Sequence, residues 1–339
     1  GQRANFEEYY SGKSLQGSYL AGIYYPDKTR VGWWKNGYPE YFAKIINSVA
    51  WIGVDIHIDG QRLDLAAVEV LDFERRLDMK SGLLHRRVTF KVDSGATFRL
   101  CSTRFYHMGS PETAALELTL QALTQAAEVS FSSGLDSQVV NSDSNYGDVF
   151  WKGQGTALVG KVLGVQAQTV KTNFTVYAAL QHKFEGPEHS QSMEQSDSAI
   201  CCTYSFKLAA EATVSLTKYV AICNSNYHAV EDLPKQAQEL VAQAAEKGFA
   251  LLKQEQADAW AEIWKLSDIS IDGDLAAQQA IRFNIFQLLQ TYTGEDARLN
   301  IGPKGFTGEK YGGVTYWDTE AYCVPFYLGC RPPEVTRNL

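Results

Sequence analysis

Leu83-Leu-His-Arg-Arg-Val-Thr-Phe-Lys-Val-Asp-Ser-Gly-Ala-Thr-Phe-Arg-Leu100 is the stretch that decides the fold class of the first two thirds of this chain. Apolar and polar residues alternate on both sides of Asp93-Ser-Gly95. A period of two places the apolar side chains on one face of an extended strand, and Asp, Ser and Gly favour a tight turn. The stretch therefore predicts a β-hairpin with one buried face.

The same pattern continues on either side of this hairpin. Residues 54–65 alternate around Asp59-Gly60, which is a second hairpin signal. Further expected strands are Ala114–Leu123, Glu128–Ser133, Ala157–Ala167, Asn173–Leu180, Ala199–Leu208 and Thr213–Ile222. Residues 1–50, with their scattered glycines and prolines, predict loops and short strands. Many closely spaced strands without intervening helices indicate a large antiparallel β-sandwich, so the fold class is α+β with several domains.

The composition changes at residues 224–234. Pro234 stands in the first turn of a run rich in Ala, Gln, Glu and Leu, which predicts a helix. Leu251–Leu266 and Leu275–Thr291 also have helical periodicity, and residues 332–339 begin another helix. We expect a β-sandwich at 1–223, a helical linker at 224–274 and an all-helical unit from 275 to 339. So few helices cannot close a helical core, which suggests a longer protein.

Charge and cysteine content exclude several classes of protein. The formal net charge of −8 over 339 residues gives no attraction to nucleic acid or to an anionic membrane, and no apolar run is long enough to span one. The cysteines at 101, 201, 202, 223, 323 and 330 lack metal-site or disulfide-framework spacing, which favours free thiols in a reducing, cytoplasmic compartment. The chain begins with Gly-Gln-Arg rather than Met, so the presence of a signal peptide stays open.

Residues 304–320 hold the chemistry-bearing cluster, Lys-Gly-Phe-Thr-Gly-Glu-Lys-Tyr-Gly-Gly-Val-Thr-Tyr-Trp-Asp-Thr-Glu. A glycine-rich loop followed by aromatic and acidic side chains suits a pocket that stacks on a ring and binds its hydroxyls, although a plain surface loop fits as well. Asp318 and Glu320, two residues apart, do not face one substrate from opposite sides. Asp318 is therefore better placed as a hydroxyl acceptor than as half of a catalytic pair. The six histidines have no metal-like spacing.

Several motifs resemble those of glycoside hydrolase family 65. They are Trp260-Ala-Glu-Ile-Trp264, Gln279-Ala-Ile-Arg-Phe-Asn284, Leu299-Asn-Ile-Gly-Pro-Lys-Gly305 and Tyr316-Trp-Asp-Thr-Glu320, with Arg75-Arg-Leu-Asp-Met-Lys-Ser-Gly-Leu-Leu-His-Arg86 and Arg3-Ala-Asn-Phe-Glu-Glu8 earlier in the chain. The resemblance covers nearly all of the chain in the family's order. It implies an N-terminal β-sandwich whose first strands precede this chain, a helical linker, and the start of an (α/α)6-barrel catalytic domain at 275–339.

The resemblance also implies an activity. Family members are generally homodimers that cleave α-glucosides with inversion, using phosphate or water and no other cofactor or metal. Trp317 and Asp318 would then bind the non-reducing glucose by ring stacking and by hydrogen bonds to its hydroxyls. The family's general acid and phosphate-binding loop lie further along, so the resemblance puts no catalytic residue in this chain and predicts that the chain alone is inactive.

The sequence also departs from the family pattern. Many members have Tyr-Arg-Gly-His-x-Phe before Trp-Asp-Thr-Glu, whereas this chain has Tyr311-Gly-Gly-Val-Thr-Tyr316. Loss of the Arg and the His argues against trehalose or kojibiose specificity. The leading hypothesis is a maltose phosphorylase-like enzyme that converts maltose and phosphate to β-glucose 1-phosphate and glucose. The alternatives are a hydrolase of the same family, of kojibiose type, and a non-catalytic module that binds carbohydrate or supports assembly.

Overall fold

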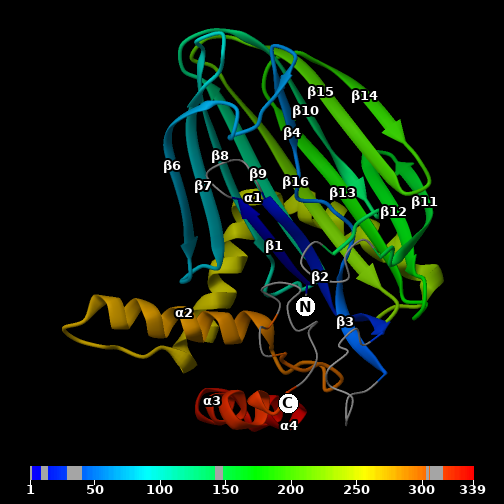
Figure 1. Ribbon diagram of the computed structural model, residues 1–339, viewed down its shortest axis with the longest axis vertical. Coiled ribbons are helices and arrows are strands. Elements are labelled where there is room, and N and C mark those ends of the chain that lie inside the picture. Colours follow the sequence, from blue (N-terminus) through cyan, green and yellow to red (C-terminus); the bar gives the residue numbers. More distant parts are fainter. Residues whose placement is uncertain (1, 9–13, 29–39, 142–147, 303–304, 306–315) are drawn as a thin grey trace.

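The computed structural model describes residues 2–8, 14–28, 40–141, 148–302, 305 and 316–339. Two large antiparallel sheets face each other, and helices lie behind them and below their lower end (Figure 1). All of the described strands precede residue 225 and the described helices follow residue 229. The expected β-sandwich followed by helices is confirmed. None of the helices in the described part of the chain is long and apolar enough to cross a membrane.

The larger sheet has eight strands in the order β11-β12-β13-β16-β9-β8-β7-β6. Their bounds in chain order are β6 Glu69–Asp78, β7 Leu83–Lys91, β8 Thr97–Tyr106, β9 Thr113–Ala122, β11 Trp151–Val159, β12 Val162–Thr169, β13 Thr175–Glu185 and β16 Thr213–Asn224. The hairpin expected around Asp93-Ser-Gly95 forms between β7 and β8, where Phe90 pairs with Phe98. Both phenylalanines are fully buried, because the alternating pattern turns them toward the second sheet.

The second sheet has five strands in the order β14-β15-β10-β4-β5. Their bounds are β4 Asp55–Ile58, β5 Gln61–Arg62, β10 Ala127–Asp136, β14 His189–Gln195 and β15 Ala199–Leu208. A third sheet is formed by β1 Gln2–Glu8, β2 Ser14–Lys28 and β3 Tyr41–Asn47. The main core lies between the two large sheets and contains Phe98, Leu100, Phe131 and Phe206.

The far face of the eight-stranded sheet is also covered, by the long helix α1, Leu233–Ser267. A second core joins them, with Tyr219, Ala221 and Cys223 of β16 packed against Leu233 and Ala237 of α1. This explains why the second half of β16 is almost continuously apolar, since both faces of a central strand are buried there. A third core holds α1 against α2, Leu275–Thr291, α3, Val324–Cys330, and α4, Pro333–Asn338.

Some sequence-based boundaries are wrong. The strand expected at Ala157–Ala167 is a hairpin, because Gly160, with a φ of 60°, makes a turn between β11 and β12. Strands β6 and β14 have no counterpart among the strands expected from the sequence, because most of their residues are polar and exposed and give no alternating apolar pattern. By contrast, the two helices expected between 233 and 266 are confirmed as the two segments of α1, which are separated by a kink at Gly248, whose φ of 79° and ψ of 160° are not helical. The helix Leu275–Thr291 has the expected bounds.

Candidate functional site

Trp317 and Asp318 lie at the entrance to a π-helical turn, Thr319–Cys323, directly before α3. The side chain of Trp317 is 68% exposed, and Tyr322 beside it is 67% exposed. The two ring centroids are 6.0 Å apart with an angle of 46° between the rings. Exposed neighbouring aromatic faces are unusual on a soluble protein, and they provide an apolar platform for a flat ligand.

Thr319 anchors the turn that carries the exposed rings of Trp317 and Tyr322, which we call the platform. Thr319 is 2% exposed, and its hydroxyl donates a hydrogen bond of 2.7 Å to the carbonyl of Ile301. The amide of Ala321 donates to the carbonyl of Trp317 at 3.1 Å. Because Thr319 is buried and Trp317, two residues earlier, is exposed, the side of the segment that carries Trp317 faces outward. Most of the glycine-rich loop expected from the sequence, residues 306–315, lies outside the described residues.

Asp318 follows Trp317 and is half-buried. Its carboxylate lies close enough to Cys323 to raise the pKa of that thiol, after burial, which is the larger cause, and together with Glu320. Asp318 and Trp317 occupy consecutive positions, and both side chains keep some contact with solvent. A carboxylate beside an exposed aromatic ring can accept hydrogen bonds from hydroxyls while the ring packs on C–H groups.

A buried tyrosine contributes to the packing of the helices next to the platform. Tyr327 of α3 has no exposed surface, and its hydroxyl donates to the carbonyl of Leu288 in α2 at 2.9 Å. Its ring meets Tyr292 edge-on, with the centroids 5.6 Å apart. The position of the exposed segment is therefore determined by the packing of α3 on α2.

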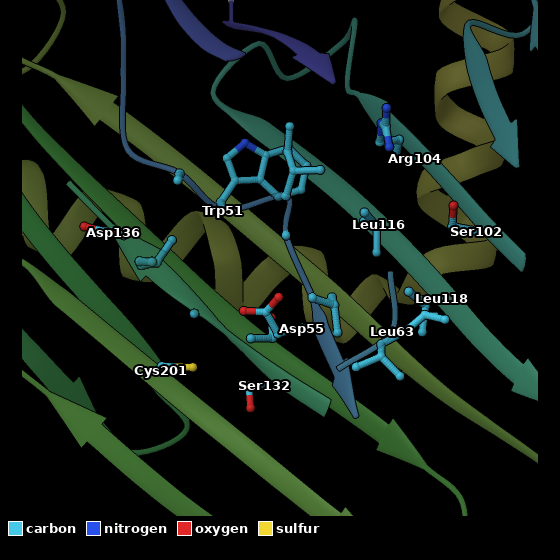
Figure 2. Close-up of a pocket in the computed structure, with 18 of the residues that line it drawn as sticks. Trp51, Asp55, Leu63, Ser102, Arg104, Leu116, Leu118, Ser132, Asp136 and Cys201 are labelled. Carbon is cyan, nitrogen blue, oxygen red and sulfur yellow. The ribbon is translucent and has the colours of Figure 1, made fainter. Parts of the chain in front are cut away.

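The sandwich contains a separate cavity of about 560 Å³ between its two sheets (Figure 2). Asp55 and Asp136 of the five-stranded sheet line one side, Ser102 and Arg104 of the eight-stranded sheet line the other, and Trp51 also lines the cavity. Trp51 is 1% exposed and its indole nitrogen donates to the hydroxyl of Tyr106 at 2.8 Å. The cavity has both polar and apolar lining residues, but its tryptophan ring is already buried and offers no free face for stacking.

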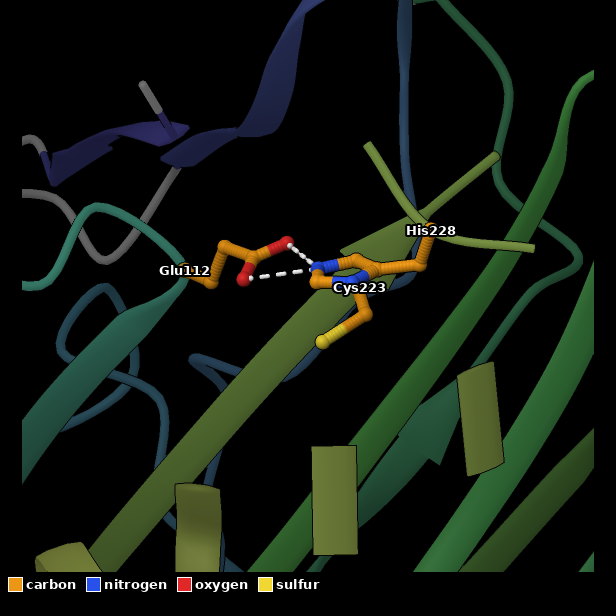
Figure 3. Close-up of side chains that lie close together, drawn as sticks. All are labelled: Glu112, Cys223 and His228. Atoms are coloured by element: carbon orange, nitrogen blue, oxygen red, sulfur yellow. Dashed lines mark hydrogen bonds and ion pairs between the residues drawn. The ribbon is translucent and has the colours of Figure 1, made fainter. Parts of the chain in front are cut away.

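Sequence reasoning missed a third group, which consists of Glu112, Cys223 and His228 (Figure 3). Spacing along the sequence gives no sign of this group, because its members are far apart in the chain. The three residues come from the turn after β8, the end of β16 and the segment before α1. Burial, followed by the nearby Glu112 carboxylate, raises the pKa of the Cys223 thiol. The six cysteines are all free, as expected, although only Cys202 and Cys223 are fully buried.

The segment that follows β16 also contacts the loop leading to the platform. Tyr227 donates a hydrogen bond of 2.9 Å to Asp296, and the guanidinium of Arg298 lies over the ring of Tyr227 at 5.2 Å. Arg298 also donates to the carbonyl of Asn226 at 3.2 Å. The bond from Arg298, as the largest cause, lowers the pKa of Asp296. The sandwich end and the loop before the platform are thus joined by charged and aromatic contacts.

Comparison with known proteins places these features in a family. Residues 1–263 match the N-terminal domain of glycosyl hydrolase family 65, and residues 282–339 match the central catalytic domain of that family. The maltose phosphorylase of Bacillus subtilis (strain 168) is 44% identical over 344 residues, which cover 100% of this chain and 45% of that protein. The α,α-trehalose phosphorylase of Thermoanaerobacter brockii is 31% identical over 363 residues, covering 100% of this chain and 45% of that protein.

A solved structure agrees with this relationship. The putative kojibiose phosphorylase from the human microbiome superposes with a TM-score of 0.86 at 30% identity, covering 98% of this chain and 43% of that one. The chain therefore spans slightly less than half the length of the relatives it matches. The family resemblance drawn from the sequence motifs is confirmed, and the chain belongs to glycosyl hydrolase family 65.

Proposed function

We propose that the chain forms the sandwich, linker and first catalytic-domain helices of an inverting α-glucoside phosphorylase. The observation that carries this proposal is the 44% identity with a maltose phosphorylase along the whole chain. The proposed division is a sandwich at 1–223, a linker at 224–274 and the beginning of an (α/α)6 barrel at 275–339. The exposed apolar side chains of Leu275 and Leu328, 89% and 65% exposed, support further helices packing on α2 and α3.

Maltose is the substrate we favour. Phosphate attacks the anomeric carbon from the face opposite the bond to the leaving glucose, that bond breaks, and β-glucose 1-phosphate forms by inversion. A general acid gives its proton to the departing oxygen. The acid and the phosphate-binding loop would belong to the part of the relatives that this chain does not match. The chain contributes binding rather than proton transfer, and no cofactor other than phosphate is required.

Trp317 and Asp318 would hold the non-reducing glucose. The exposed ring of Trp317 packs on one face of the sugar, and the Asp318 carboxylate accepts hydrogen bonds from two neighbouring hydroxyls. Such charge-assisted bonds position the anomeric carbon for attack, so they contribute to the rate as well as to affinity. The soluble homodimer and the cytoplasmic location suggested by the sequence remain part of this proposal.

An assay of the full-length protein tests the activity. We expect maltose to be consumed only when phosphate is present, with one glucose released for each phosphate used. Hydrolysis at the same rate without phosphate would instead favour a family 65 hydrolase. The same assay with trehalose, kojibiose and nigerose defines the specificity.

The roles of Trp317 and Asp318 are tested by substitution. Asp318→Asn keeps the shape of the side chain and removes its charge, so we expect kcat/KM for maltose to fall by about 100-fold or more, or roughly 3 kcal/mol. Trp317→Ala should raise KM more than Trp317→Phe, which keeps a ring. Glu334→Gln is the matched control, because it removes an exposed carboxylate in α4. Similar effects of Asp318→Asn and Glu334→Gln would contradict the assignment of Asp318.

The cavity between the sheets supports the second candidate, a carbohydrate-binding sandwich. Its volume of about 560 Å³ is sufficient for a small saccharide, and Asp55 and Asp136 could accept hydroxyl hydrogen bonds. Calorimetry with maltose separates the candidates. Binding abolished by Ser132→Trp, which fills the cavity, would favour the sandwich, whereas binding abolished by Trp317→Ala favours the phosphorylase site.

A further inference from the structure

Glu112, Cys223 and His228 lie together where the sandwich passes into the helical linker (Figure 3). Glu112 lies in the turn between β8 and β9, Cys223 is the second-last residue of β16, and His228 lies between β16 and α1. One ligand atom from each residue can be chosen so that all three lie within 4.8 Å of one another. The group is separate from the platform of Trp317 and from the cavity between the sheets.

Main-chain hydrogen bonds hold all three residues in place. The amide of Ile222 donates to the carbonyl of Glu112 at 2.9 Å, which ties the turn after β8 to the end of β16. The amide of His228 donates to the carbonyl of Asn224 at 3.2 Å, so the chain folds back over Cys223. Cys223 itself pairs with Tyr177 in the sheet. The arrangement is therefore set by the backbone and does not depend on mobile side chains alone.

The three side chains are within reach of one ion, although the contact between His228 and Glu112 now has the length of a hydrogen bond. His228 Nε2 lies 2.8 Å and 3.0 Å from the two carboxylate oxygens of Glu112. Tetrahedral zinc sites place ligand atoms roughly 3.3–3.6 Å apart, as follows from Zn–ligand bonds of about 2.0–2.3 Å. Small rotations of the side chains would open the pair and admit an ion. The Glu112 and His228 side chains are 23% and 24% exposed, so the site is open to solvent on one side.

The types of ligand decide which ion would fit. Ca²⁺ and Mg²⁺ prefer oxygen atoms alone, whereas a thiolate, an imidazole and a carboxylate suit Zn²⁺ or a similar first-row divalent ion. Cys223 as thiolate and Glu112 as carboxylate carry two negative charges, which a divalent cation balances. A neutral complex is favourable here because the sulfur is fully buried beside Leu233 and Ala237.

We propose that Glu112, Cys223 and His228 form a binding site for a zinc-type divalent cation, with water at a fourth, open position. On binding, the thiol proton leaves for solvent, and the imidazole proton resides on Nδ1 so that the lone pair of Nε2 binds the metal. The cation would crosslink the turn after β8, the end of β16 and the start of the linker. The alternative is a purely structural role, in which Glu112 and His228 form an ion pair next to the buried Cys223 and no metal binds.

Cobalt provides a direct test, because a thiolate bound to Co²⁺ has a charge-transfer absorption that oxygen and nitrogen ligands do not give. The protein, purified without a histidine tag and freed of metal with a chelator, is titrated with Co²⁺ and then with Zn²⁺. We expect one Co²⁺ for each chain, the charge-transfer band, and loss of that band when Zn²⁺ displaces the cobalt. Zinc should also raise the Tm.

Variants separate a metal site from an ion pair. Cys223→Ser should remove the charge-transfer band, whereas Cys101→Ser, which takes a thiol from β8 outside the group, should keep it. Glu112→Gln can still accept a hydrogen bond from His228, so we expect nearly the parental Tm without metal but at least a 10-fold weaker affinity for cobalt. If Cys223→Ser fails to fold, the cobalt affinity of Glu112→Gln still distinguishes a metal site from an ion pair. The proposal is overturned by an absent band at millimolar Co²⁺, or by bands of equal intensity in Cys223→Ser and the parent.

Discussion

Lys218 is a fully buried lysine in the central strand β16. Its ammonium donates to the carbonyl of Gly53 at 2.9 Å and to the carbonyl of Trp51. These bonds fasten the segment before β4 to the eight-stranded sheet. Burial removes the ammonium from water and lowers the pKa of Lys218 to about 7. Lys218 therefore links two parts of the sandwich through hydrogen bonds, while the burial of its charge lowers the stability of the fold.

This residue predicts a pH dependence of stability. An unfolded lysine keeps its proton up to about pH 10.4, so between about pH 7 and that value the unfolded chain binds more protons than the native one. Stability contributed by Lys218 must then rise with pH across this window. Each pKa unit corresponds to about 1.4 kcal/mol, so the free energy of unfolding of the parent should gain a few kcal/mol relative to Lys218→Met between about pH 7 and about pH 10. Urea unfolding at the two pH values measures the difference.

Comparing the parent with the variant cancels the titration of the tyrosines and other groups they share. Lys161→Met is the control, since Lys161 is exposed in the turn between β11 and β12 and should leave the pH dependence unchanged. Parallel pH profiles for the parent and Lys218→Met would show that the buried ammonium does not titrate in this range.

At the scale of the elements, Gly82 lies where a turn of the sandwich comes into close contact with α1. It lies in the turn between β6 and β7 with a φ of 67°, and a methyl group added there would overlap the indole nitrogen of Trp260 and lie 2.7 Å from Gln256 Nε2. Trp260 is 1% exposed and is stacked on Phe286, so it cannot move aside. The close approach of this turn to α1 requires glycine.

Gly82→Ala should therefore be severely destabilising. The left-handed backbone costs about 1–2 kcal/mol for alanine, and overpacking adds about 1–3 kcal/mol. Gly95→Ala is the matched control, because Gly95 has a φ of 87° and open space around it, so only the backbone cost of about 1–2 kcal/mol applies. Denaturant unfolding gives both values. Equal losses of stability would mean that α1 adapts to the added methyl group.

The elements differ in how well the sequence predicted them. The hairpin around Asp93-Ser-Gly95 and the helix Leu275–Thr291 were predictable, because local periodicity and turn residues agree with the tertiary structure. Strands β6 and β14 could not be predicted from the sequence, because they lie at the edges of their sheets and carry few buried apolar residues. The candidate site residues Trp317 and Asp318 were predicted from a motif, and their role stays a proposal. Glu112, Cys223 and His228 could not be found, because main-chain pairing between distant segments creates their proximity.

At the scale of the whole molecule, the described residues form three apolar cores that follow one another from the sandwich to the helices. The first fills the sandwich, the second joins the eight-stranded sheet to α1, and the third joins α1 to α2, α3 and α4. Trp260 is the buried α1 residue of the third core, where its ring stacks on Phe286 with the centroids 4.4 Å apart. The position of the Trp317 platform relative to the sandwich therefore depends on this contact and on the polar contacts of Tyr227 with Asp296 and Arg298.

This arrangement predicts that the helical end can lose stability while the sandwich stays folded. Phe286→Ala removes a side chain that is 3% exposed and should cost the third core about 3–5 kcal/mol. Arg282→Gln, on the same helix, breaks the ion pair with Asp268, but those side chains are 41% and 37% exposed and the expected loss is about 0–1 kcal/mol. Hydrogen exchange of the native protein should show faster exchange of α2, α3 and α4 in Phe286→Ala, with β9 and β16 still protected. If the sandwich strands lost protection to the same degree, the three cores would unfold as one unit, and the platform would be no more mobile than the sandwich that supports it.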